Sequence, residues 1–359
     1  MKRSILAGAL RAALQMLGLM LLLGAIVILA ESTPAQTQSF NIVKVADGVY
    51  AGIGQNGVYG NGAFIVTRDY VVVVDTQARP SWAKDMIAEI HKVTDKPVRY
   101  VINTHWHGDH TLGNQAYVEA FGPTVEFVGQ NYMREDLIAR GIPQLQAQAQ
   151  SLPAAVAQMQ KQLADGKDAQ GNALTPQART ALQSQLALQQ AYLPELPTVH
   201  VVPSTITYEN EMTIQAPDRE IRLLHYSYAH TRGDTIVYLP KERVIITGDL
   251  LTNGIPNTRT SYPVEWITTL EAMDKLDWTV AIPGHGDVQQ GKTQLEALLS
   301  YWKDVVAGVR DAIAKKMTLD QAKRSIDLSR YKANFLNFDQ WNPLAIERAY
   351  TELTGGAMQ

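Results

Sequence analysis

The sequence predicts an α/β protein, a sandwich of two mixed sheets flanked by helices, with a helical hairpin inserted in it. Three observations lead to this fold class. A series of short apolar runs followed by an amphipathic helix occurs twice along the chain. A Gln- and Ala-rich stretch at about 141–194 separates the two series and holds no β-branched run. In both halves, histidine and aspartate residues lie next to predicted strands, where loops often carry chemistry.

The first half begins at Phe40 with short β-runs that turn residues separate. The run at 70–74 is apolar throughout, which indicates a strand buried on both faces. Asn56-Gly57 and Asn61-Gly62 are typical of hairpin turns. The expected strands are 40–45, 48–50, 63–66, 70–74 and 97–102, and the expected helix is 80–91, with Trp82, Met86, Ile87 and Ile90 on its apolar side.

The insert at about 141–194 is predicted to be a helical hairpin. Its helices are expected to start at Ser151 and at Thr175-Pro176, and leucines recur at helical spacing at 182, 186 and 193. Two roles are open at this point: a packing or oligomerisation element, or a wall over the functional site.

The β pattern returns after the insert and ends in helices. The expected strands are 200–203, 205–208, 221–224, 235–239 and 244–247, and the expected helices are 264–276 and 292–315. The sequence therefore predicts three parts: a leader at 1–39, a sandwich domain at 40–315 that contains the insert, and a C-terminal helical extension at 316–359.

The leader at 1–39 predicts the localisation of the protein. It starts with Met1-Lys2-Arg3, continues with an uncharged apolar run from Met16 to Ala30 and ends in a polar spacer. This pattern, with Thr33-x-Ala35 as a cleavage site, is typical of a secretory signal peptide. An uncleaved membrane anchor is the alternative, because the run extended back to Ala12 approaches about 20 residues. We expect an exported protein, periplasmic or secreted, or one tethered to the membrane by this segment.

The composition excludes several classes of protein. Lys and Arg number 32 against 35 Asp and Glu, a net charge of −3, so no nucleic-acid partner is expected. The sequence has no cysteine, which excludes disulfide scaffolds, Cys-ligated zinc, iron–sulfur clusters and a thiol nucleophile. The expected partner is a small-molecule substrate, and the oligomeric state is left open.

The most informative stretch is Thr104-His105-Trp106-His107-Gly108-Asp109-His110, which follows the predicted strand at 97–102. Three of the eight histidines of the chain lie within six positions here. Imidazole nitrogens are good ligands of borderline divalent cations, and a tight loop can aim alternate side chains at one ion. Three imidazoles this close would repel one another when protonated, which favours a bound cation or burial. We therefore expect a metal site in this loop.

Further candidate ligands lie next to strands of the second half. His230 precedes the predicted strand at 235–239, Asp249 follows the strand at 244–247, and His285 follows an apolar run at 280–282. With the first motif they make seven candidate ligands, five histidines and two aspartates. That set suits two metal ions with an aspartate bridge and a shared water.

The ordered pattern His105-x-His107-x-Asp109-His110, then His230, Asp249 and His285, resembles the metallo-β-lactamase superfamily of binuclear hydrolases. The resemblance covers about 40–300 apart from the insert, and it implies a four-layer αββα sandwich. It also implies two Zn²⁺ sites bridged by Asp249: His105, His107 and His230 for the first, and Asp109, His110 and His285 for the second. Asp75, after the run at 71–74, resembles the aspartate that steadies the metal loop of this family.

The resemblance implies metal-assisted hydrolysis. A hydroxide between two Zn²⁺ ions would attack the carbonyl of a lactam, lactone, ester or thioester. Asp109 is the expected catalytic residue, because it would hold the second metal and orient the nucleophile. An aspartate at position 249 departs from the best-known lactamases, which have a cysteine there, and is the pattern of thioesterases and lactonases.

Several alternatives stay open on the same ligands. Iron or manganese could replace zinc, since carboxylate-containing sites accept both. The chemistry could instead be that of a mononuclear iron sulfur dioxygenase, or the hydrolysis of a phosphodiester or a sulfate ester. A non-enzymatic binding protein is the least favoured alternative, because all seven ligand positions are filled.

Overall fold

The computed structural model describes residues 39–55 and 60–356. The expected leader, apart from Ser39, and the Asn56-Gly57 turn lie outside these ranges. Within the described ranges, none of the helices combines the length and the apolar character needed to cross a bilayer.

The first sheet has seven strands in the order β1-β2-β3-β4-β5-β6-β7. β1 to β4 pair antiparallel, and β4 to β7 pair parallel. Every residue of β4 is buried, because the strand lies inside the sheet and both of its faces are covered. The strands are β1 (Phe40–Ala46), β2 (Val49–Gly54), β3 (Gly62–Val66), β4 (Val71–Val74), β5 (Val98–Ile102), β6 (Glu126–Gln130) and β7 (Ile206–Tyr208).

The second sheet has six strands in the order β13-β12-β11-β10-β9-β8. β8 to β11 pair antiparallel, β11 and β12 pair parallel, and β13 closes the edge antiparallel. The strands are β8 (Glu211–Gln215), β9 (Glu220–Leu224), β10 (Ile236–Leu239), β11 (Val244–Thr252), β12 (Val280–His285) and β13 (Gln289–Gln290).

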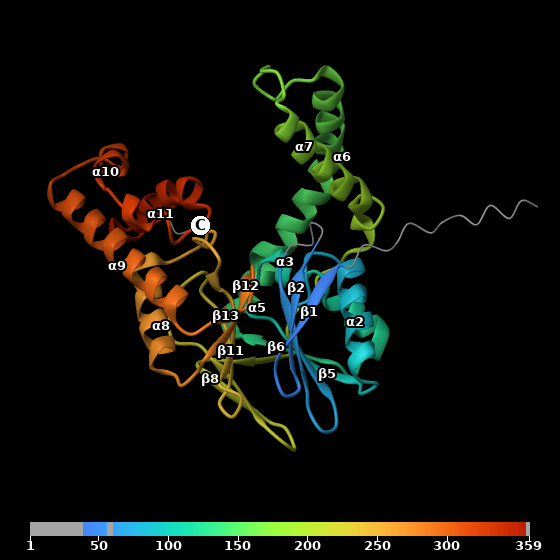
Figure 1. Ribbon diagram of the computed structural model, residues 1–359. Helices are drawn as coiled ribbons and strands as arrows, with labels where there is room; N and C mark the ends of the chain where they lie inside the picture. Colours follow the sequence, from blue (N-terminus) through green and yellow to red (C-terminus); the bar gives the residue numbers. More distant parts are fainter. Residues whose placement is uncertain (1–38, 56–59, 357–359) are drawn as a thin grey trace, which may run out of the picture. The chain divides into compact units, whose positions relative to one another are not determined.

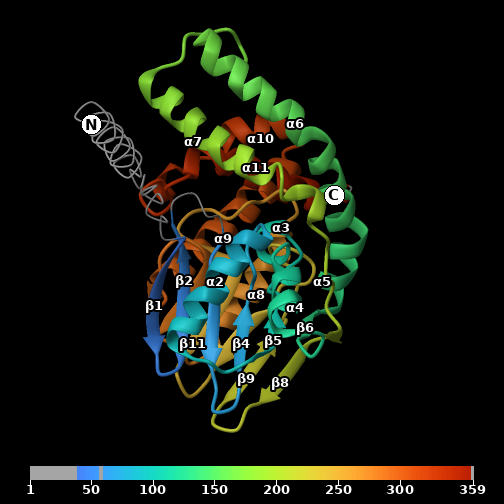
Figure 2. The ribbon, with the colours of Figure 1, turned by 90° about the vertical axis from the view of Figure 1, so that its right-hand side faces the viewer.

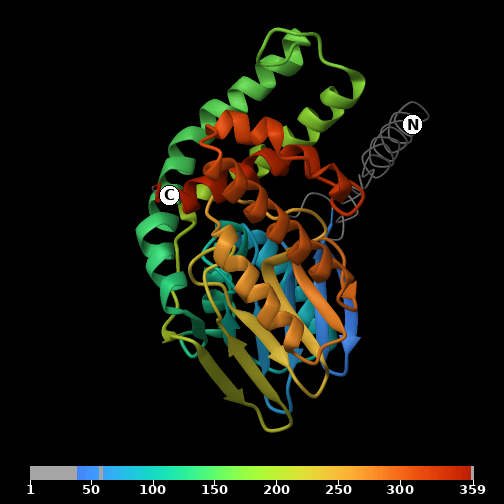
Figure 3. The same cartoon turned by 90° about the vertical axis from the view of Figure 1, so that its left-hand side faces the viewer.

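Helices cover the outer face of each sheet, which confirms the predicted αββα sandwich. Figure 2 shows α2 and α4 in front of the first sheet, and Figure 3 shows the orange α8 and α9 in front of the second. Between the sheets, Ile102 and Val128 belong to the same core cluster as Leu223 and Val237. The helices are α2 (Pro80–Val93), α3 (Gly108–Thr111), α4 (Asn114–Phe121), α5 (Asn131–Asp136), α6 (Ile142–Asp165), α7 (Pro176–Tyr192), α8 (Pro263–Lys275), α9 (Thr293–Ala314), α10 (Leu319–Ser325) and α11 (Phe338–Leu353).

The insert is a hairpin of α6 and α7 that projects from the sandwich (Figure 1). α7 begins as predicted, because the side chain of Thr175 accepts a hydrogen bond from Ala178 N and Pro176 follows it. The predicted start of α6 at Ser151 is wrong. A π turn at Leu137–Gly141 joins α5 directly to α6, so Ser151 lies inside the helix.

The base of the hairpin is attached to α2. The Glu195 carboxylate accepts hydrogen bonds from the backbone N–H and the hydroxyl of Ser81, at 2.6 and 2.8 Å. The Arg79 guanidinium lies 3.8 Å from the ring centre of Trp82 and 4.7 Å from that of Tyr192. These contacts fix the end of α7 beside the start of α2.

Two further expectations differ from the structure. The strand expected at 200–203 is wrong, because side chains of α4 form hydrogen bonds with the backbone of this segment. Gln115 accepts a hydrogen bond from His200 N, and Asn114 donates one to Val202 O, both at 2.8 Å. Asn61-Gly62 is not a hairpin turn. Gly62 begins β3, and Asn61 is hydrogen-bonded to the distant segment around His285.

Candidate metal centre

The seven predicted ligands converge at one edge of the sandwich. Four of them lie in and just before α3, directly after β5, and the others lie before β10, in β11 and at the end of β12. They form two groups, each with ligand atoms within 4.8 Å of one another. The first group is His105, His107, His230 and Asp249, and the second is Asp109, His110 and His285.

Three imidazole nitrogens of the first group face one another. His107 Nδ1 lies 3.1 Å from His105 Nε2 and 3.0 Å from His230 Nε2. Asp249 Oδ2 lies 3.4 Å from His230 Nε2 and 4.0 Å from His105 Nε2. Four ligands placed tetrahedrally around one ion at ~2.1 Å would be about 3.4 Å apart, so these separations suit a single cation.

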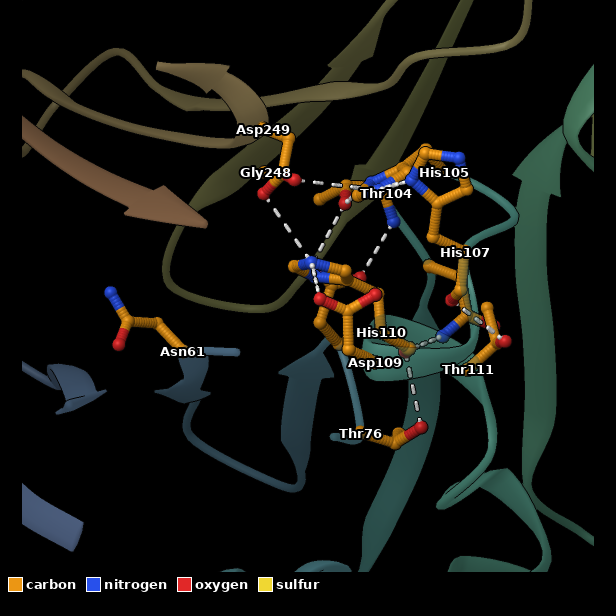
Figure 4. Close-up of polar contacts among 12 residues, drawn as sticks. Asn61, Thr76, Thr104, His105, His107, Asp109, His110, Thr111, Gly248 and Asp249 are labelled. Atoms are coloured by element: carbon orange, nitrogen blue, oxygen red, sulfur yellow. Dashed lines mark hydrogen bonds and ion pairs between the residues drawn. The ribbon is translucent and has the colours of Figure 1, made fainter. Parts of the chain in front are cut away.

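The histidines of the second group face Oδ1, the other carboxylate oxygen of Asp249. Asp249 Oδ1 lies 3.3 Å from Nε2 of both His110 and His285, and Asp109 Oδ2 lies 3.2 Å from His285 Nε2. Figure 4 shows the Asp249 carboxylate with contacts toward His105 and toward His110. Asp249 is therefore placed between the two groups.

Hydrogen bonds on the outer side of two of the rings fix how their inner nitrogens face the ligand groups. His110 Nδ1 lies 2.8 Å from Asp75 Oδ2, so Nδ1 is directed outward and Nε2 faces the ligand groups. The Thr260 hydroxyl donates to His230 O at 3.3 Å and therefore accepts from His107 Nε2 at 3.0 Å, which leaves His107 Nδ1 free to bind a cation.

Asp75 organises the loop that carries four of the ligands. Its carboxylate accepts hydrogen bonds from the backbone N–H and the hydroxyl of Thr104, both at 2.7 Å, besides its contact with His110. Thr104 Oγ1 in turn lies 3.0 Å from His105 Nδ1. Asp75 has a φ of 61°, an uncommon value for a residue other than glycine. The network of contacts outweighs this backbone strain.

Glycines permit the close approach of the loops. A Cβ on Gly284 would collide with Asp249 Oδ1, and a Cβ on Gly248 would collide with the Thr104 hydroxyl. Asn61 connects the first sheet to the His285 segment, since its amide donates to Pro283 O at 2.9 Å and to Gly286 O at 2.7 Å. This segment is thus held on both sides of His285.

Burial and neighbouring charges set the protonation of the two groups. Burial lowers the pKa of His107 to about 4, that of His230 to about 3 and that of His105 well below its ordinary value. Burial opposes a charge on His285 as well, but Asp249 and Asp109 outweigh it and raise the pKa to about 9. His110 and His285 hold the pKa of Asp109 well below its usual range, against the effect of burial. The three histidines of the first group are therefore neutral imidazoles, the form that binds metal.

A further observation indicates that these donor atoms fit metal cations. His110 Nε2 and Asp249 Oδ1 are buried 3.3 Å apart, and neither makes a hydrogen bond of standard geometry to a described residue. Buried polar atoms are rarely left without partners. Both atoms point between the two groups, where a cation would satisfy them.

A cavity of about 1010 Å³ opens from this cluster. Candidate ligands line it, among them His107, Asp109 and His285. Residues of the hairpin line it as well, among them Leu145 of α6 and Leu188 of α7. Of the two roles left open for the insert, the wall over the site is the one that this arrangement supports.

Two residues beside the cluster were not predicted from the sequence. Thr260 lies in a loop without a recognisable pattern, and Asn61 was interpreted as a turn residue. The C-terminal extension positions the Thr260 loop: Asn337 accepts from Ile255 N at 2.8 Å, and Arg348 Nε donates to Ser261 O at 2.7 Å. No sequence signal connects this extension to the candidate ligands.

Comparisons with known proteins agree with the fold. The family model of the metallo-beta-lactamase superfamily matches residues 56–133. A linear primary-alkylsulfatase of Pseudomonas sp. is 23% identical over 284 residues, which are 74% of this chain and 49% of that protein.

Solved structures show the same fold. The sec-alkylsulfatase Pisa1 from Pseudomonas sp. matches 89% of this chain and 51% of its own, with a TM-score of 0.62 and 14% identity. A metallo-β-lactamase from Hirschia baltica matches 73% of this chain and 96% of its own, with a TM-score of 0.50 and 18% identity. The chain spans about half the length of the two alkylsulfatases.

The family-model match at residues 56–133 and the shared fold show that the chain is similar to the metallo-β-lactamase superfamily. The His and Asp cluster is a candidate metal site.

Proposed function

We propose that this chain is a metal-dependent hydrolase with two cations, one held by His105, His107 and His230 and one by Asp109, His110 and His285. The position of Asp249 carries the proposal. Its Oδ2 lies 3.4 Å from a nitrogen of the first set, and its Oδ1 lies 3.3 Å from two nitrogens of the second. A carboxylate that faces two ligand sets suits a bridge between two cations.

Zn²⁺ is the proposed metal, since imidazole nitrogen and carboxylate oxygen are its usual ligands in a protein without cysteine, and Fe or Mn fits the same donors. When bound, the cations would polarise the scissile group and lower the pKa of water at the site. The chain itself supplies the positions of the donors and the shape of the cavity.

Asp109 is the proposed catalytic residue. Its side chain is 21% exposed and lines the cavity, whereas the Asp249 side chain is 6% exposed between the two groups. His110 and His285 keep the Asp109 carboxylate ionised, as the lowered pKa indicates. An ionised carboxylate at the cavity surface can orient a water molecule and hold its proton during attack on the substrate.

Two substrate classes are candidates. The first is a carbonyl compound: a lactam, lactone, ester or thioester. The second is a sulfate ester of an aliphatic alcohol, and the extent of the structural similarity favours it, since the alkylsulfatase structure matches 89% of this chain and the lactamase structure 73%. The apolar side chains of Leu145 and Leu188 in the cavity also suit an alkyl chain.

A hydrolysis panel tests the proposal. It contains a cephalosporin, a homoserine lactone, a glutathione thioester, a carboxylic ester, octyl sulfate and a phosphodiester, each with and without a chelator. We expect turnover of at least one substrate, its loss on chelation and its recovery with Zn²⁺. Octyl sulfate as the preferred substrate would support the second class over the first.

Two histidine variants test whether metal content and turnover depend on the candidate metal centre. His107→Ala should lower both metal content and turnover, while His200→Ala, an exposed histidine outside both groups, should change neither. Turnover that survives both chelation and His107→Ala contradicts the proposal. One iron per chain together with oxygen consumption would establish the dioxygenase alternative instead.

A further inference from the structure

The cavity at the metal centre carries more positive than negative side chains. Arg79, Arg140 and Arg259 line it, and its acidic lining residues are Asp109 and Asp249, both of them candidate ligands. In the described part of the chain, none of the three arginines forms an ion pair. Bound cations would neutralise the two aspartates, so the loaded cavity would be strongly positive.

Arg140 is the arginine attached to the metal-binding loop. It lies in the π turn between α5 and α6, and its guanidinium carbon is 4.7 Å from the ring centre of Trp106. Trp106 lies between His105 and His107 in the chain and is buried. One face of the guanidinium is covered by the indole. Its N–H donors make no hydrogen bond to any residue that the structure describes, and they remain available to the cavity.

The π turn is fixed at both ends. Before it, Asp136 accepts two hydrogen bonds from Arg232, at 3.1 and 2.7 Å, and Arg232 lies two residues after His230. At its last residue, a Cβ on Gly141 would collide with Leu137 Cδ1 at 2.9 Å, and it would lie in ordinary contact, at 3.7 Å, with Trp106 Cε3. A π turn adds a residue to a helix, and such turns are frequent at functional sites. Arg140 is thereby held in a defined position relative to both metal-binding loops.

We propose that Arg140 is a specificity-determining residue that binds an oxyanion of the substrate, a carboxylate or a sulfate, next to the bond that is cleaved. A guanidinium near bound cations is repelled by them, and an anionic substrate removes that repulsion. Its planar donors match the paired oxygens of carboxylate and sulfate. The substrate is then an amphiphile, with its oxyanion at Arg140 and its apolar part beneath the hairpin. This inference rests on the proposed function, because it concerns the substrate of the same site.

Binding without turnover tests this inference. The probes are 1-octanesulfonate, octanoate and 1-octanol, titrated calorimetrically into Zn²⁺-loaded protein. We expect the two anions to bind and the alcohol to bind much more weakly. Arg140→Gln should weaken anion binding by about 10- to 100-fold, as expected for the loss of a hydrogen bond between charged groups. Arg140→Lys should retain part of the affinity, because it keeps the charge without the planar pair of donors.

The controls show whether a loss of anion binding in Arg140→Gln is local or reflects a general change in the protein. Arg310→Gln removes an exposed arginine of α9 outside the cavity and should leave anion binding unchanged. Metal content and the thermal unfolding midpoint of Arg140→Gln should match those of the wild type. Preference for the sulfonate indicates a sulfate group on the substrate, and preference for octanoate indicates a carboxylate.

Two results overturn the inference: equal anion affinity in Arg140→Gln and wild type, or octanol binding as tight as that of the anions. Failure of the proposed function gives a different pattern. In that case no substrate of the hydrolysis panel is turned over, while binding of the anions still depends on Arg140.

Discussion

Asp75 Oδ2 lies 2.8 Å from His110 Nδ1, and the same carboxylate accepts two hydrogen bonds from Thr104 at 2.7 Å. One buried side chain therefore orients a candidate ligand of the second group and the residue next to His105 of the first. The carboxylate is not itself within either ligand group, so its effect on metal binding is exerted through the rings and the loop.

Replacing Asp75 with Asn should weaken metal binding without removing a ligand. The amide carries less negative charge and cannot accept all three hydrogen bonds, so the rings lose their fixed orientation. We expect metal affinity to fall by about 10- to 100-fold, measured by competition with a chromophoric chelator. Asp69→Asn, at an exposed turn, is the matched control. Equal affinities of the Asp75 variant and the wild type would refute this role.

The hydroxyl of Thr260 should select the tautomer of His107. In Thr260→Val the side chain keeps its shape, but His107 Nε2 loses its acceptor, so the proton can move to Nδ1, which faces the other ligands. We expect Zn²⁺ affinity to fall by about tenfold and Thr260→Ser to restore most of it. Nitrogen-15 NMR of the imidazoles in the metal-free protein reports the tautomer directly. An unchanged His107 spectrum in the valine variant would contradict this prediction.

Gly284 should be required for the position of Asp249. A methyl group added at Gly284 collides with Asp249 Oδ1, so Gly284→Ala must displace the carboxylate between the two groups. We expect a loss of bound metal, measured by elemental analysis after gel filtration. Gly171→Ala is the control for backbone strain, since its φ is 87° but its added methyl group meets nothing within 4 Å and displaces no candidate ligand. Full metal content in Gly284→Ala would show that Asp249 is not needed at this position.

Glu352 should make stability depend on pH. Burial, with a further contribution from the charge of Glu265, raises the pKa of Glu352 from 4.5 to about 7. The folded chain then holds this proton to a higher pH than the unfolded chain, so the free energy of unfolding falls as pH rises from about 4.5 to 7.

Glu352→Gln removes this contribution. The difference in the free energy of unfolding between variant and wild type should change by about 1–2 kcal/mol across that window, a value reduced for the partial exposure of the side chain. Urea unfolding at several pH values measures it, and the comparison of the two proteins cancels the titration of other groups. If the free energy of unfolding depends on pH in the same way in both proteins, the raised pKa of Glu352 is ruled out.

Much of the candidate site could be predicted because the chemistry of each ligand is visible in its residue type. The residues 105–110 are close in sequence, and His230, Asp249 and His285 each adjoin an apolar run that forms a strand. The ends of neighbouring strands lie at one edge of a sheet, which brings distant residues together. Asp75 could be predicted for the same reason, since it follows the continuously apolar β4.

What could not be predicted depends on contacts between distant segments. β6 contains a glycine and a glutamate and has no clear alternation, so it forms a strand because β5 and β7 pair with it. Thr260 acquires its role only because the C-terminal extension holds its loop, through Asn337 and Arg348. The 200–203 segment has strand-forming residues, yet α4 side chains bind its backbone instead.

The hairpin of α6 and α7 lines part of the cavity without contributing a candidate ligand. Its inward positions, such as Gln144, Gln148 and Gln189, can be exchanged without moving a donor atom. Much of the cavity wall and all of the candidate ligands thus belong to separate stretches of the gene. A library of mutations confined to these helices would reshape the cavity and leave every candidate ligand in the sequence.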